Sequence, residues 1–327
     1  MRVLYEYSEV KSEVLLEFIA CHKPIQKYFK NEWGVVKTKN HCGILSTGAE
    51  DFYILPKIVK SDEAANLNIF IYMLIYAYDI RLENEEIASS QNEKQTILEL
   101  FIQLFAKKLL REFGKGLYKE YTTEQENLTT LRGKYLVDEN LKYNFTHHKI
   151  YCEYDEFSAN SLLNQLFLYA IKFLLSHAKN KRFLKECELI LDEVEYKIFD
   201  VERLNIHFHR LNKRFLKSYE FAILLLKHLT PLFEKDKKSF AFLFDMNELF
   251  EKFVGRICQS IEPATRLQSQ KNFGNLQLKP DIIMPNLIID TKYKILKSRD
   301  DLAVSDKYQM FVYGTNFEIK NTMLLYP

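Results

Sequence analysis

The chain has 327 residues, of which 47% are hydrophobic and 14% aromatic, a composition that excludes a disordered or fibrous protein and allows two domains with buried cores. Its 46 lysines and arginines stand against 44 aspartates and glutamates, so the formal net charge is only +2. That balance neither requires nor excludes nucleic acid, and any contact with DNA must come from a local basic patch.

Cysteine spacing and hydropathy predict a reducing compartment and no membrane anchor. Five cysteines lie far apart, with no Cys-x-x-Cys pair, which argues against a zinc cluster and a disulfide framework. The start of the chain, Met1–Glu13, lacks the continuous apolar core of a signal peptide. The most apolar run, Ile69–Tyr78, stops at Asp79 and is too short to span a bilayer. We therefore expect a soluble, cytoplasmic protein with no membrane partner.

Residues 1 to about 60 are expected to be rich in β-strands, because apolar pieces such as Val3–Tyr7 and Phe52–Leu55 are separated by glycines. Gly43 and Gly48 have the glycine spacing of a phosphate-binding loop. Ala49-Glu50 follow, however, where such a loop requires Lys and then Ser or Thr. The sequence therefore favours a glycine turn between strands over a nucleotide site.

Apolar residues recur at helical spacing in several segments that follow. The predicted helices are Asp62–Leu82, Lys94–Phe113 with Gly114 and Gly116 as a C-terminal cap, a long helix capped by Ser158 that runs to about Lys179, and residues 184–198 and 211–229. Residues 117–155 are predicted to be loop and strand. The domain boundary is expected near residue 150.

The segment Asn205–Lys217 alternates cationic and apolar side chains. Two interpretations stay open: a contact with DNA phosphates, or an amphipathic helix with a solvated basic face. His207 and His209 are a weak metal pair, because no carboxylate or cysteine is close to them in sequence. The neighbours His147-His148 are weaker still, since adjacent side chains seldom share one ligand direction.

The stretch Leu278–Lys294 has the pattern of a β-hairpin. Two apolar runs, Ile282–Met284 and Leu287–Ile289, flank Pro285-Asn286, a pair that favours a turn. If the turn is centred there, residues whose numbers sum to 571 face each other, so Asp281 lies opposite Asp290 with Cβ atoms about 5 Å apart. Lys292 points to the same face as Asp290, because side chains alternate along a strand.

Two facing carboxylates repel unless a cation compensates them. Mg²⁺ prefers oxygen ligands and needs only one or two carboxylates together with substrate phosphates. Pro-Asp-(x)8-Asp-x-Lys is also the pattern of PD-(D/E)xK nucleases, in which the acids hold the metal and the lysine positions or deprotonates the attacking water and offsets charge on the phosphate. The alternative is an ordinary hairpin with surface acids. The Pro-Asp pair, the apolar strands and the computable register favour the nuclease.

The helix predicted before the hairpin carries a third candidate acid. Asp245 and Glu248 have the spacing of a capping box, so Glu248 is expected to serve the helix start. Glu251 has no such role and lies beside Val254, at the edge of the buried face. Nucleases of this pattern commonly take one more acid from a helix preceding the hairpin, so Glu251 is the expected additional metal ligand.

Two further elements are predicted after the hairpin. Asp306–Tyr313 is expected to be a helix on which Gln309 and Tyr313, four residues apart, share a face. These two side chains are expected to contact the DNA backbone or to orient Lys292. The apolar run Met323–Pro327 is expected to add a strand to the sheet of the hairpin, which completes an α/β arrangement.

Taken together, these segments resemble McrC, the nuclease subunit of the McrBC modification-dependent restriction system. The resemblance lies in LFDMNELFEKFV, LKPDII with LIIDTKYK, DKYQMFVYG and LLYP, in the central segments GLYKEY, LRGKYLV and CEYDEFSANSLLNQLFLYAI, and in DFYILPKI near the N-terminus. It implies an α+β/α/β fold: a β-rich N-terminal docking module, a helical middle and a C-terminal PD-(D/E)xK restriction-endonuclease-like α/β domain. Residues 1–150 would form the partner-docking domain, and residues 151–327 a helical linker region with the nuclease core at 240–327.

The resemblance also implies a partner and a reaction. McrC-like proteins join a hexameric AAA+ GTPase, McrB, which recognises modified double-stranded DNA and translocates, while the McrC subunit stimulates GTP hydrolysis and cuts the DNA with Mg²⁺. By motif match, the catalytic residues are Asp281, Asp290, Lys292 and Glu251, the metal ligands are Asp281, Asp290 and Glu251, and Gln309 and Tyr313 support them. The family usually continues beyond the Leu-Tyr-Pro strand, whereas this chain ends at Pro327, a difference expected to spare the active site but to weaken stability or DNA binding.

Two other functions remain as alternatives. The chain is either a stand-alone PD-(D/E)xK nuclease that needs no ATPase or GTPase, or a non-catalytic subunit that docks on and activates an AAA+ ring. The intact set of Asp281, Asp290 and Lys292 argues against the non-catalytic alternative.

Overall fold

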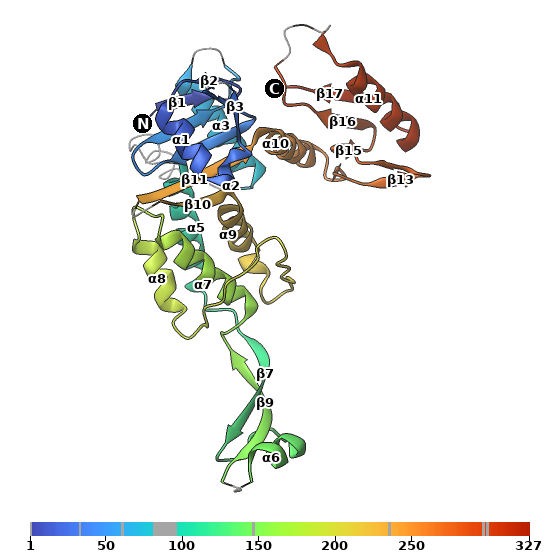
Figure 1. Ribbon diagram of the computed structural model, residues 1–327. Coiled ribbons are helices and arrows are strands. Elements are labelled where there is room, and N and C mark those ends of the chain that lie inside the picture. The colour runs from blue at the N-terminus through green and yellow to red at the C-terminus, as the bar shows by residue number, and fades with distance from the viewer. Residues whose placement is uncertain are drawn as a thin grey trace. The chain divides into compact units, whose positions relative to one another are not determined.

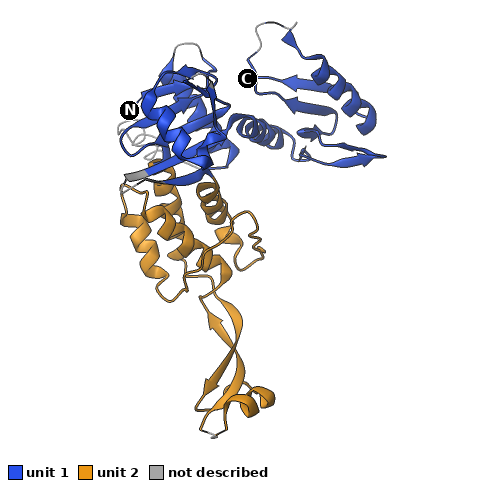
Figure 2. Cartoon of the chain, in the orientation of Figure 1, with its two compact units in different colours: residues 1–98, 228–327 blue, residues 99–227 orange. Residues whose placement is uncertain are grey.

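The computed structural model describes residues 2–32, 34–59, 62–80, 97–145, 148–234, 237–295, 298 and 301–327. The chain forms two compact units, residues 1–98 with 228–327, and residues 99–227 (Figure 2). The boundary expected near residue 150 falls in strand β9 (Ile150–Ser158), inside the second unit. Strand β7 (Glu120–Leu128) pairs with β9 along its whole length, so the chain on both sides of residue 150 belongs to one unit.

A five-stranded sheet forms the first half of unit 1. Its order is β1 (Arg2–Tyr5), β6 (Asp51–Leu55), β5 (His41–Ser46), β11 (Lys237–Asp245) and β10 (Leu229–Glu234), with only β1 and β6 parallel (Figure 1). The β-rich start of the chain is therefore confirmed. Strands β10 and β11, from residues 229–245, were not predicted. They pair with each other, and β11 joins the sheet through β5, which lies about 200 residues earlier in the sequence.

Two short helices and a small sheet pack on this five-stranded sheet. They are α1 (Glu13–Cys21), α2 (Lys23–Gln26), β2 (Glu9–Val10), β4 (Val35–Thr38) and β3 (Phe29–Glu32). Helix α1 begins at Ser12, whose hydroxyl accepts a hydrogen bond from the Leu15 amide. Leu15 and its neighbours on α1 share one buried core with the apolar side chains of β5 and β6. The sequence analysis did not predict either helix.

The glycine turn predicted near residues 43–48 is confirmed at Gly48, whose φ of +77° lies in the turn between β5 and β6. Gly43 lies instead inside strand β5, with a φ of +141°. A Cβ atom at this position would overlap the carbonyl oxygen of Phe242 on the neighbouring strand β11. The close approach of β5 to β11 therefore requires glycine at residue 43.

The two helices predicted next are both present, but the first ends at Ala77, before the described residues Tyr78–Ile80 that were expected to be helical. The two helices are α3 (Glu63–Ala77), which is capped by the Asp62 side chain, and α5 (Ile97–Phe113). The predicted ends at residues 81–82 and 94–96 lie outside the described residues. Within the described part of the chain, no helix combines the length and the apolar character needed to cross a bilayer.

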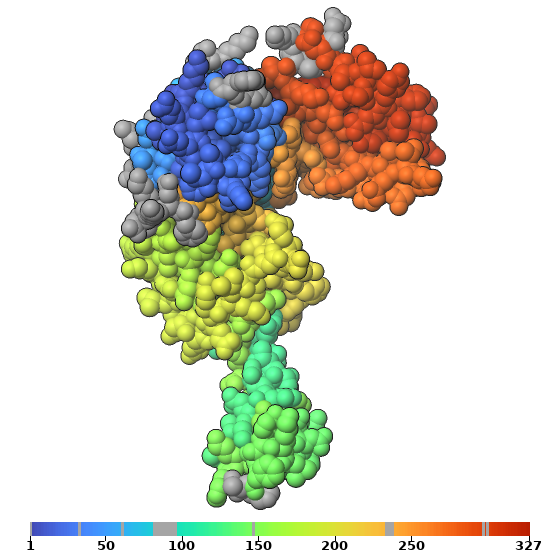
Figure 3. Space-filling view, in the orientation of Figure 1, coloured from blue at the N-terminus to red at the C-terminus, as the bar shows by residue number. Residues whose placement is uncertain are grey.

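Unit 2 contains a helical part and a long β-ribbon. Besides α5, its elements are β7, β8 (Lys134–Tyr135), α6 (Val137–Tyr143), β9, α7 (Leu162–Leu175), α8 (Arg182–Ile190), a 3-10 turn (Lys213–Phe215) and α9 (Leu216–His228). The ribbon of β7 and β9, with α6 at its far end, stands clear of the helices of this unit (Figure 3). This ribbon occupies the segment expected to be loop and strand.

Three predicted boundaries in unit 2 are wrong. Helix α7 is capped by Ser161, whose hydroxyl accepts from the Asn164 amide, whereas Ser158 is the last residue of β9. Helix α8 ends at Ile190 rather than at residue 198. The predicted helix 211–229 becomes regular only at Leu216, and it ends at His228, before β10.

The C-terminal part of unit 1 starts with helix α10 (Met246–Ile261). Then follow β12 (Arg266–Leu267), the hairpin of β13 (Lys271–Phe273) and β14 (Leu276–Leu278), β15 (Ile282–Met284), β16 (Leu287–Thr291), α11 (Val304–Phe317) and β17 (Thr322–Leu325). Strands β12, β15, β16 and β17 form one sheet in that order. Helix α11 connects the parallel strands β16 and β17, and its buried Met310 and Tyr313 pack on Ile288 of β16. The predicted hairpin, helix and last strand are all confirmed.

We predict that Gly43→Ala lowers the free energy of unfolding by on the order of 3 kcal/mol, because the added methyl group combines a backbone clash with an unfavourable positive φ. Gly34→Ala is the matched control, since Gly34 also has a positive φ, of +78°, but has no other atom within 4 Å of its added Cβ. That variant should lose only about 1 kcal/mol. Urea denaturation of both variants measures the difference, and equal losses would contradict the prediction.

Candidate active site

The β15–β16 hairpin has the predicted register. Ile282 pairs with Ile289, Ile283 with Ile288 and Met284 with Leu287, so each pair of numbers sums to 571. Asp281 immediately precedes β15, and Asp290 is the penultimate residue of β16. The Asp281 Oδ2 atom accepts two hydrogen bonds from Thr291, from its amide at 2.7 Å and from its hydroxyl at 2.8 Å. Thr291, which follows Asp290 directly, therefore fixes the carboxylate of Asp281.

Asp290 is a buried carboxylate, with only 1% of its surface exposed. Its Oδ2 atom lies 2.5 Å from the Lys292 ammonium nitrogen but accepts no well-directed hydrogen bond from any described residue. Burial raises the pKa of Asp290, and the charge of Asp281 adds to that effect, while Lys292 opposes it. The ionised form of Asp290 is thus stabilised by one cationic neighbour and disfavoured by the rest of its surroundings.

Lys292 is held by side chains of α11. Its ammonium group donates a hydrogen bond to Gln309 Oε1 at 3.1 Å, Gln309 Nε2 donates to the Tyr313 hydroxyl at 2.8 Å, and that hydroxyl donates to the Lys279 carbonyl at 3.3 Å. Burial lowers the pKa of Lys292, but Asp290 and more distant carboxylates outweigh burial, so the net pKa is raised. Lys292 is therefore a cation at neutral pH. The predicted shared face of Gln309 and Tyr313 is confirmed, and Gln309 contacts the lysine.

Glu251, on α10, reaches the site through a residue that the sequence analysis missed. Its Oε1 atom accepts a hydrogen bond from the side-chain Nε2 atom of Gln268 at 2.6 Å. The backbone amide of Gln268 in turn donates to the backbone carbonyl of Asp281 at 2.8 Å. Burial raises the pKa of Glu251, and the charge of Asp281 raises it further. Gln268 has a φ of +46°, which is unfavourable for a residue with a Cβ atom. No local pattern marks this conformation in the sequence.

Asp306, in the first turn of α11, is a second residue that the sequence analysis did not assign. It is 8% exposed, and its Oδ2 atom lies 3.5 Å from the Lys294 ammonium nitrogen. Its negative charge contributes to the raised pKa values of both Asp290 and Lys292. A signal for it was present, since Asp306 precedes Gln309 by three residues and shares its helix face.

The strand that carries the lysine is anchored immediately after it. The hydroxyl of Tyr293, which is 6% exposed, donates a hydrogen bond of 2.7 Å to Glu6 Oε1, just after strand β1. The same oxygen accepts from the Lys57 amide at 2.9 Å, and the Tyr293 ring contacts Phe250 of α10. Lys292 therefore projects from a strand end that is fixed on both sides, by Asp281 with Thr291 and by Tyr293.

The other candidate residues form no comparable site. The basic segment is irregular up to Asn212, and His209 there contacts the Tyr118 hydroxyl across 3.2 Å, while Arg214 donates to two backbone carbonyls of the same unit. The helical interpretation therefore fails for its first half. His147 lies outside the described residues. Asp245 caps α10 as predicted, and Glu248 pairs with Lys252 at 2.7 Å.

The described residues contain no group of three or more His, Cys, Asp or Glu side chains that could hold a metal ion. Glu251 is bonded to Gln268 rather than drawn together with Asp281 and Asp290 into a closed three-ligand group. A Mg²⁺ ion does not require such a group, because one or two carboxylates with water and substrate phosphate suffice. The ligand set of Asp281, Asp290 and Glu251 therefore stays a prediction.

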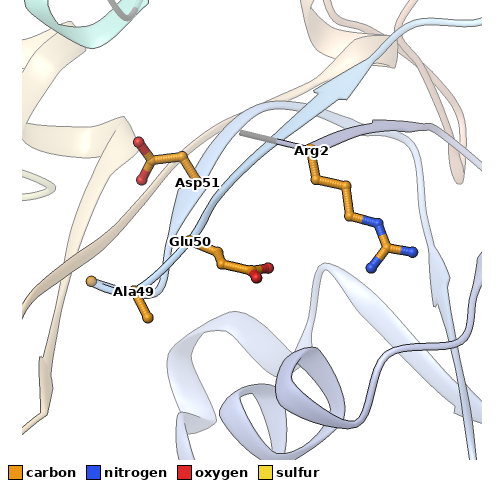
Figure 4. Close-up of a pocket in the computed structure, with 5 residues that line it drawn as sticks. Arg2, Ala49, Glu50 and Asp51 are labelled. Atoms are coloured by element: carbon orange, nitrogen blue, oxygen red, sulfur yellow. The ribbon is translucent and has the colours of Figure 1, made fainter.

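A cavity of about 430 Å³ lies elsewhere, in the N-terminal half of unit 1, and contains none of the candidate catalytic residues. Arg2, Gly48, Ala49, Glu50 and Asp51 line it (Figure 4). The two carboxylates at its wall disfavour phosphate, which agrees with the absence of a phosphate-loop lysine after Gly48.

Three comparisons relate the chain to known proteins. The family described as McrBC 5-methylcytosine restriction system component matches residues 36–327. No curated protein matches the chain. A chain in the refined half-complex from a tetradecameric assembly of Thermococcus gammatolerans McrB AAA+ hexamers with bound McrC has a TM-score of 0.67 and 23% identity, over 100% of this chain and 87% of that chain. A chain in the cryo-EM structure of the Thermococcus gammatolerans McrBC complex has a TM-score of 0.56 and 24% identity, over 79% of this chain and 87% of that chain. At these identities the likeness shows a shared fold.

We predict that Asp290→Asn raises the thermal stability of the chain near pH 7 in EDTA. The pKa of Asp290 is raised in the folded chain, so the folded state binds the proton more tightly than the unfolded state. The stability that this carboxyl contributes is therefore fully present below about pH 4, its usual pKa, and is lost as the pH rises through its folded-state pKa. The neutral amide avoids that loss, although it also removes the carboxylate that raises the pKa of Lys292. We therefore expect a small net gain near pH 7 that shrinks on acidification. A melting temperature below that of the wild type at every pH would contradict this prediction.

Proposed function

Since the chain belongs to the McrBC 5-methylcytosine restriction system component family, we propose that it is the McrC-type nuclease subunit of such a system and hydrolyses DNA phosphodiester bonds. One observation carries the proposal. The hairpin register brings Asp281 and Asp290 to neighbouring strand positions, with Lys292 in contact with Asp290 and with Gln309. Two acids and a lysine gathered at a β-hairpin are what the PD-(D/E)xK pattern predicts, and this agreement supports the proposal.

The donor atoms at this site fit a hard divalent cation such as Mg²⁺. Asp290 presents a buried carboxylate whose Oδ2 atom contacts only the Lys292 ammonium group among the described residues, and Asp281 has one oxygen fixed by Thr291. Two carboxylates this close raise the cost of ionisation, which a cation would reverse. We assign Asp281 and Asp290 as the ligands, with Glu251 beside them. When bound, the ion would polarise a phosphate oxygen and acidify a water molecule.

The side chains of this chain have separate roles in the proposed reaction. Water adds to the phosphorus atom, and the bond from phosphorus to one ester oxygen breaks. Lys292, a cation held between Asp290 and Gln309, stabilises the negative charge that develops on the phosphate. Gln309 and Tyr313 fix the position of the lysine, and Thr291 fixes the carboxylate of Asp281. These positioning contacts come from α11 and from β16 itself.

We propose that the subunit works with a hexameric AAA+ GTPase of the McrB type and stimulates its GTP hydrolysis. The support is the family, together with the likeness to chains from complexes in which McrB AAA+ hexamers hold McrC. The ribbon of unit 2 offers a surface for such a partner, because it exposes large apolar side chains that a folded chain seldom leaves in water. The exposed fractions are 74% for Tyr121, 63% for Leu141 and 84% for Phe145.

The proposed substrate is double-stranded DNA that carries a modified base. The family description names 5-methylcytosine, and reading of the modified base is assigned to the AAA+ partner. Incubation of the purified chain with DNA and Mg²⁺ alone separates this proposal from a stand-alone nuclease. Robust cleavage without the partner and GTP would favour the stand-alone enzyme.

We predict that Asp290→Ala and Lys292→Ala each reduce DNA cleavage at least about 10³-fold, because a metal ligand or the charge-stabilising cation is lost. Stimulation of the partner's GTP hydrolysis should be unchanged, since neither side chain belongs to the ribbon. The control is Lys307→Ala, an exposed lysine on α11. Cleavage of modified plasmid and GTP turnover are measured on the same assembled complex. Full cleavage by Asp290→Ala would show that this carboxylate is not needed for cutting and would contradict the proposed site.

We predict that Gln309→Ala reduces cleavage about 10- to 100-fold, because Lys292 loses the acceptor that orients it while its charge remains. Asn316→Ala is the matched control on the same helix, since its amide donates only to a carbonyl of α11 itself. Single-turnover cleavage at saturating Mg²⁺ is the measurement. Equal rates for both variants would show that Gln309 has no positioning role.

A further inference from the structure

The β13–β14 hairpin lies in a stretch of sequence with an unusual charge pattern. In a chain with 44 acidic residues, residues 263–280 contain none. The same stretch carries three cationic side chains, Arg266, Lys271 and Lys279, and all three are exposed. This is a local basic surface of the kind that a nearly neutral protein needs in order to contact DNA.

The two faces of this hairpin differ in chemistry. Lys271 pairs with Leu278, Asn272 with Gln277 and Phe273 with Leu276, and directly opposed residues lie on the same face. One face therefore carries the amides Asn272 and Gln277, and both are exposed. The other face carries Phe273, Leu276 and Leu278, together with Lys271 at its exposed end. Asparagine and glutamine side chains are the amide groups that proteins use to bind base edges and phosphates.

The apolar face attaches the hairpin to helix α11. The Phe273 ring packs edge-on against Phe317 of α11, with ring centroids 5.5 Å apart. Leu278 joins the small core formed by Ile288, Met310 and Tyr313. The Lys271 ammonium nitrogen lies 4.8 Å from the centre of the Phe273 ring. The hairpin is thus held by the same helix that orients Lys292, and its amide face remains open to solvent.

The hairpin is also close to the candidate active site along the chain. Only two residues, Lys279 and Pro280, separate Leu278 from Asp281, a span of about 10 Å in an extended chain. The Lys279 carbonyl accepts the Tyr313 hydrogen bond, and the charge of Lys279 lowers the pKa of Glu251. The hairpin extends away from the four-stranded sheet at the edge of this part of the chain (Figure 1).

We propose that the β13–β14 hairpin is the element that holds duplex DNA against the nuclease site. Arg266, Lys271 and Lys279 bind phosphates, and the amide face lies in or along a groove, since a two-stranded ribbon fits the major groove of B-DNA. The partner is double-stranded DNA. Its negative charge is complementary to these three cations, and it is the substrate of the nuclease site proposed beside the hairpin. This inference rests on the proposed nuclease function and extends it to the binding of substrate.

The test measures duplex binding by the full chain in EDTA, by fluorescence anisotropy between about 50 and 200 mM salt. For Lys271→Ala/Lys279→Ala we expect an affinity at least about tenfold weaker, and a slope of log affinity against log salt that is smaller by about 2. The matched control is Lys307→Ala/Lys320→Ala, which removes two exposed lysines from the same part of the chain. The control should keep the wild-type slope.

A second variant tests the amide face. Asn272→Ala/Gln277→Ala should weaken binding without changing the salt slope, because the lost groups are uncharged. In addition, Asn275→p-benzoylphenylalanine at the hairpin turn should crosslink to DNA both in the chain alone and in its complex with the partner. The crosslink does not depend on the folding of an alanine variant, and melting temperatures check that each variant is folded.

The outcomes separate this inference from the proposed function. Asp290→Ala should bind duplex normally and fail to cut. Suppose that Asp290→Ala binds but does not cut, while the hairpin variants bind like the wild type and residue 275 gives no crosslink. The inference about the hairpin is then wrong, and the nuclease function stands. A crosslink from residue 275 to the protein partner instead of DNA also overturns it. If Asp290→Ala cuts normally while the hairpin variants lose affinity, the nuclease assignment fails and DNA binding stands.

Discussion

The contact between Lys292 and the buried Asp290 is the interaction on which the candidate site depends. Asp290 lies in β16 with only 1% of its surface exposed, and an ionised carboxylate is costly there unless a cation lies beside it. The hairpin register determines whether that cation is present. A slip of one residue would turn Asp290 to the opposite face of the sheet and bring Ile289 to its place. The tight turn at Pro285-Asn286 and the two apolar runs beside it set the register, and with it the charge balance of the site.

Hydrogen bonds from separate elements hold the charged groups in place. Lys292 is bonded to Gln309 of α11, Asp281 to Thr291 of β16, and Glu251 of α10 to Gln268 of the loop after β12. Each bond joins two segments that are far apart in sequence or lie on different elements. The geometry of the site therefore depends on the packing of α10, α11 and the sheet together. A change that loosens any one of these contacts displaces a charged group without altering the catalytic side chains themselves.

The sequence predicted the hairpin register and helix α11 closely, because both follow from local periodicity and a local turn. Other features depend on distant partners and could not be predicted in this way. Strand β11 joins β5 through the close approach at Gly43, and no repeat or spacing connects those two segments. Ser158 and Ser161 are both suitable helix caps, and only the pairing of β9 with β7 decides that Ser158 belongs to a strand. Gln268 was missed because its positive φ arises from tertiary contacts.

Tyr293 links the candidate site by a hydrogen bond to the N-terminal sheet of the same unit. Tyr293 follows Lys292 directly, and its hydroxyl bonds to Glu6, which also accepts the Lys57 amide. Glu6 is 2% exposed and one of its oxygens lacks a partner among the described residues, so breaking the Tyr293 bond would leave a buried carboxyl still less satisfied. The strand end that carries the lysine and the sheet that carries Glu6 are therefore expected to move together. A partner that displaces this sheet would act on the position of Lys292 through the Tyr293–Glu6 hydrogen bond.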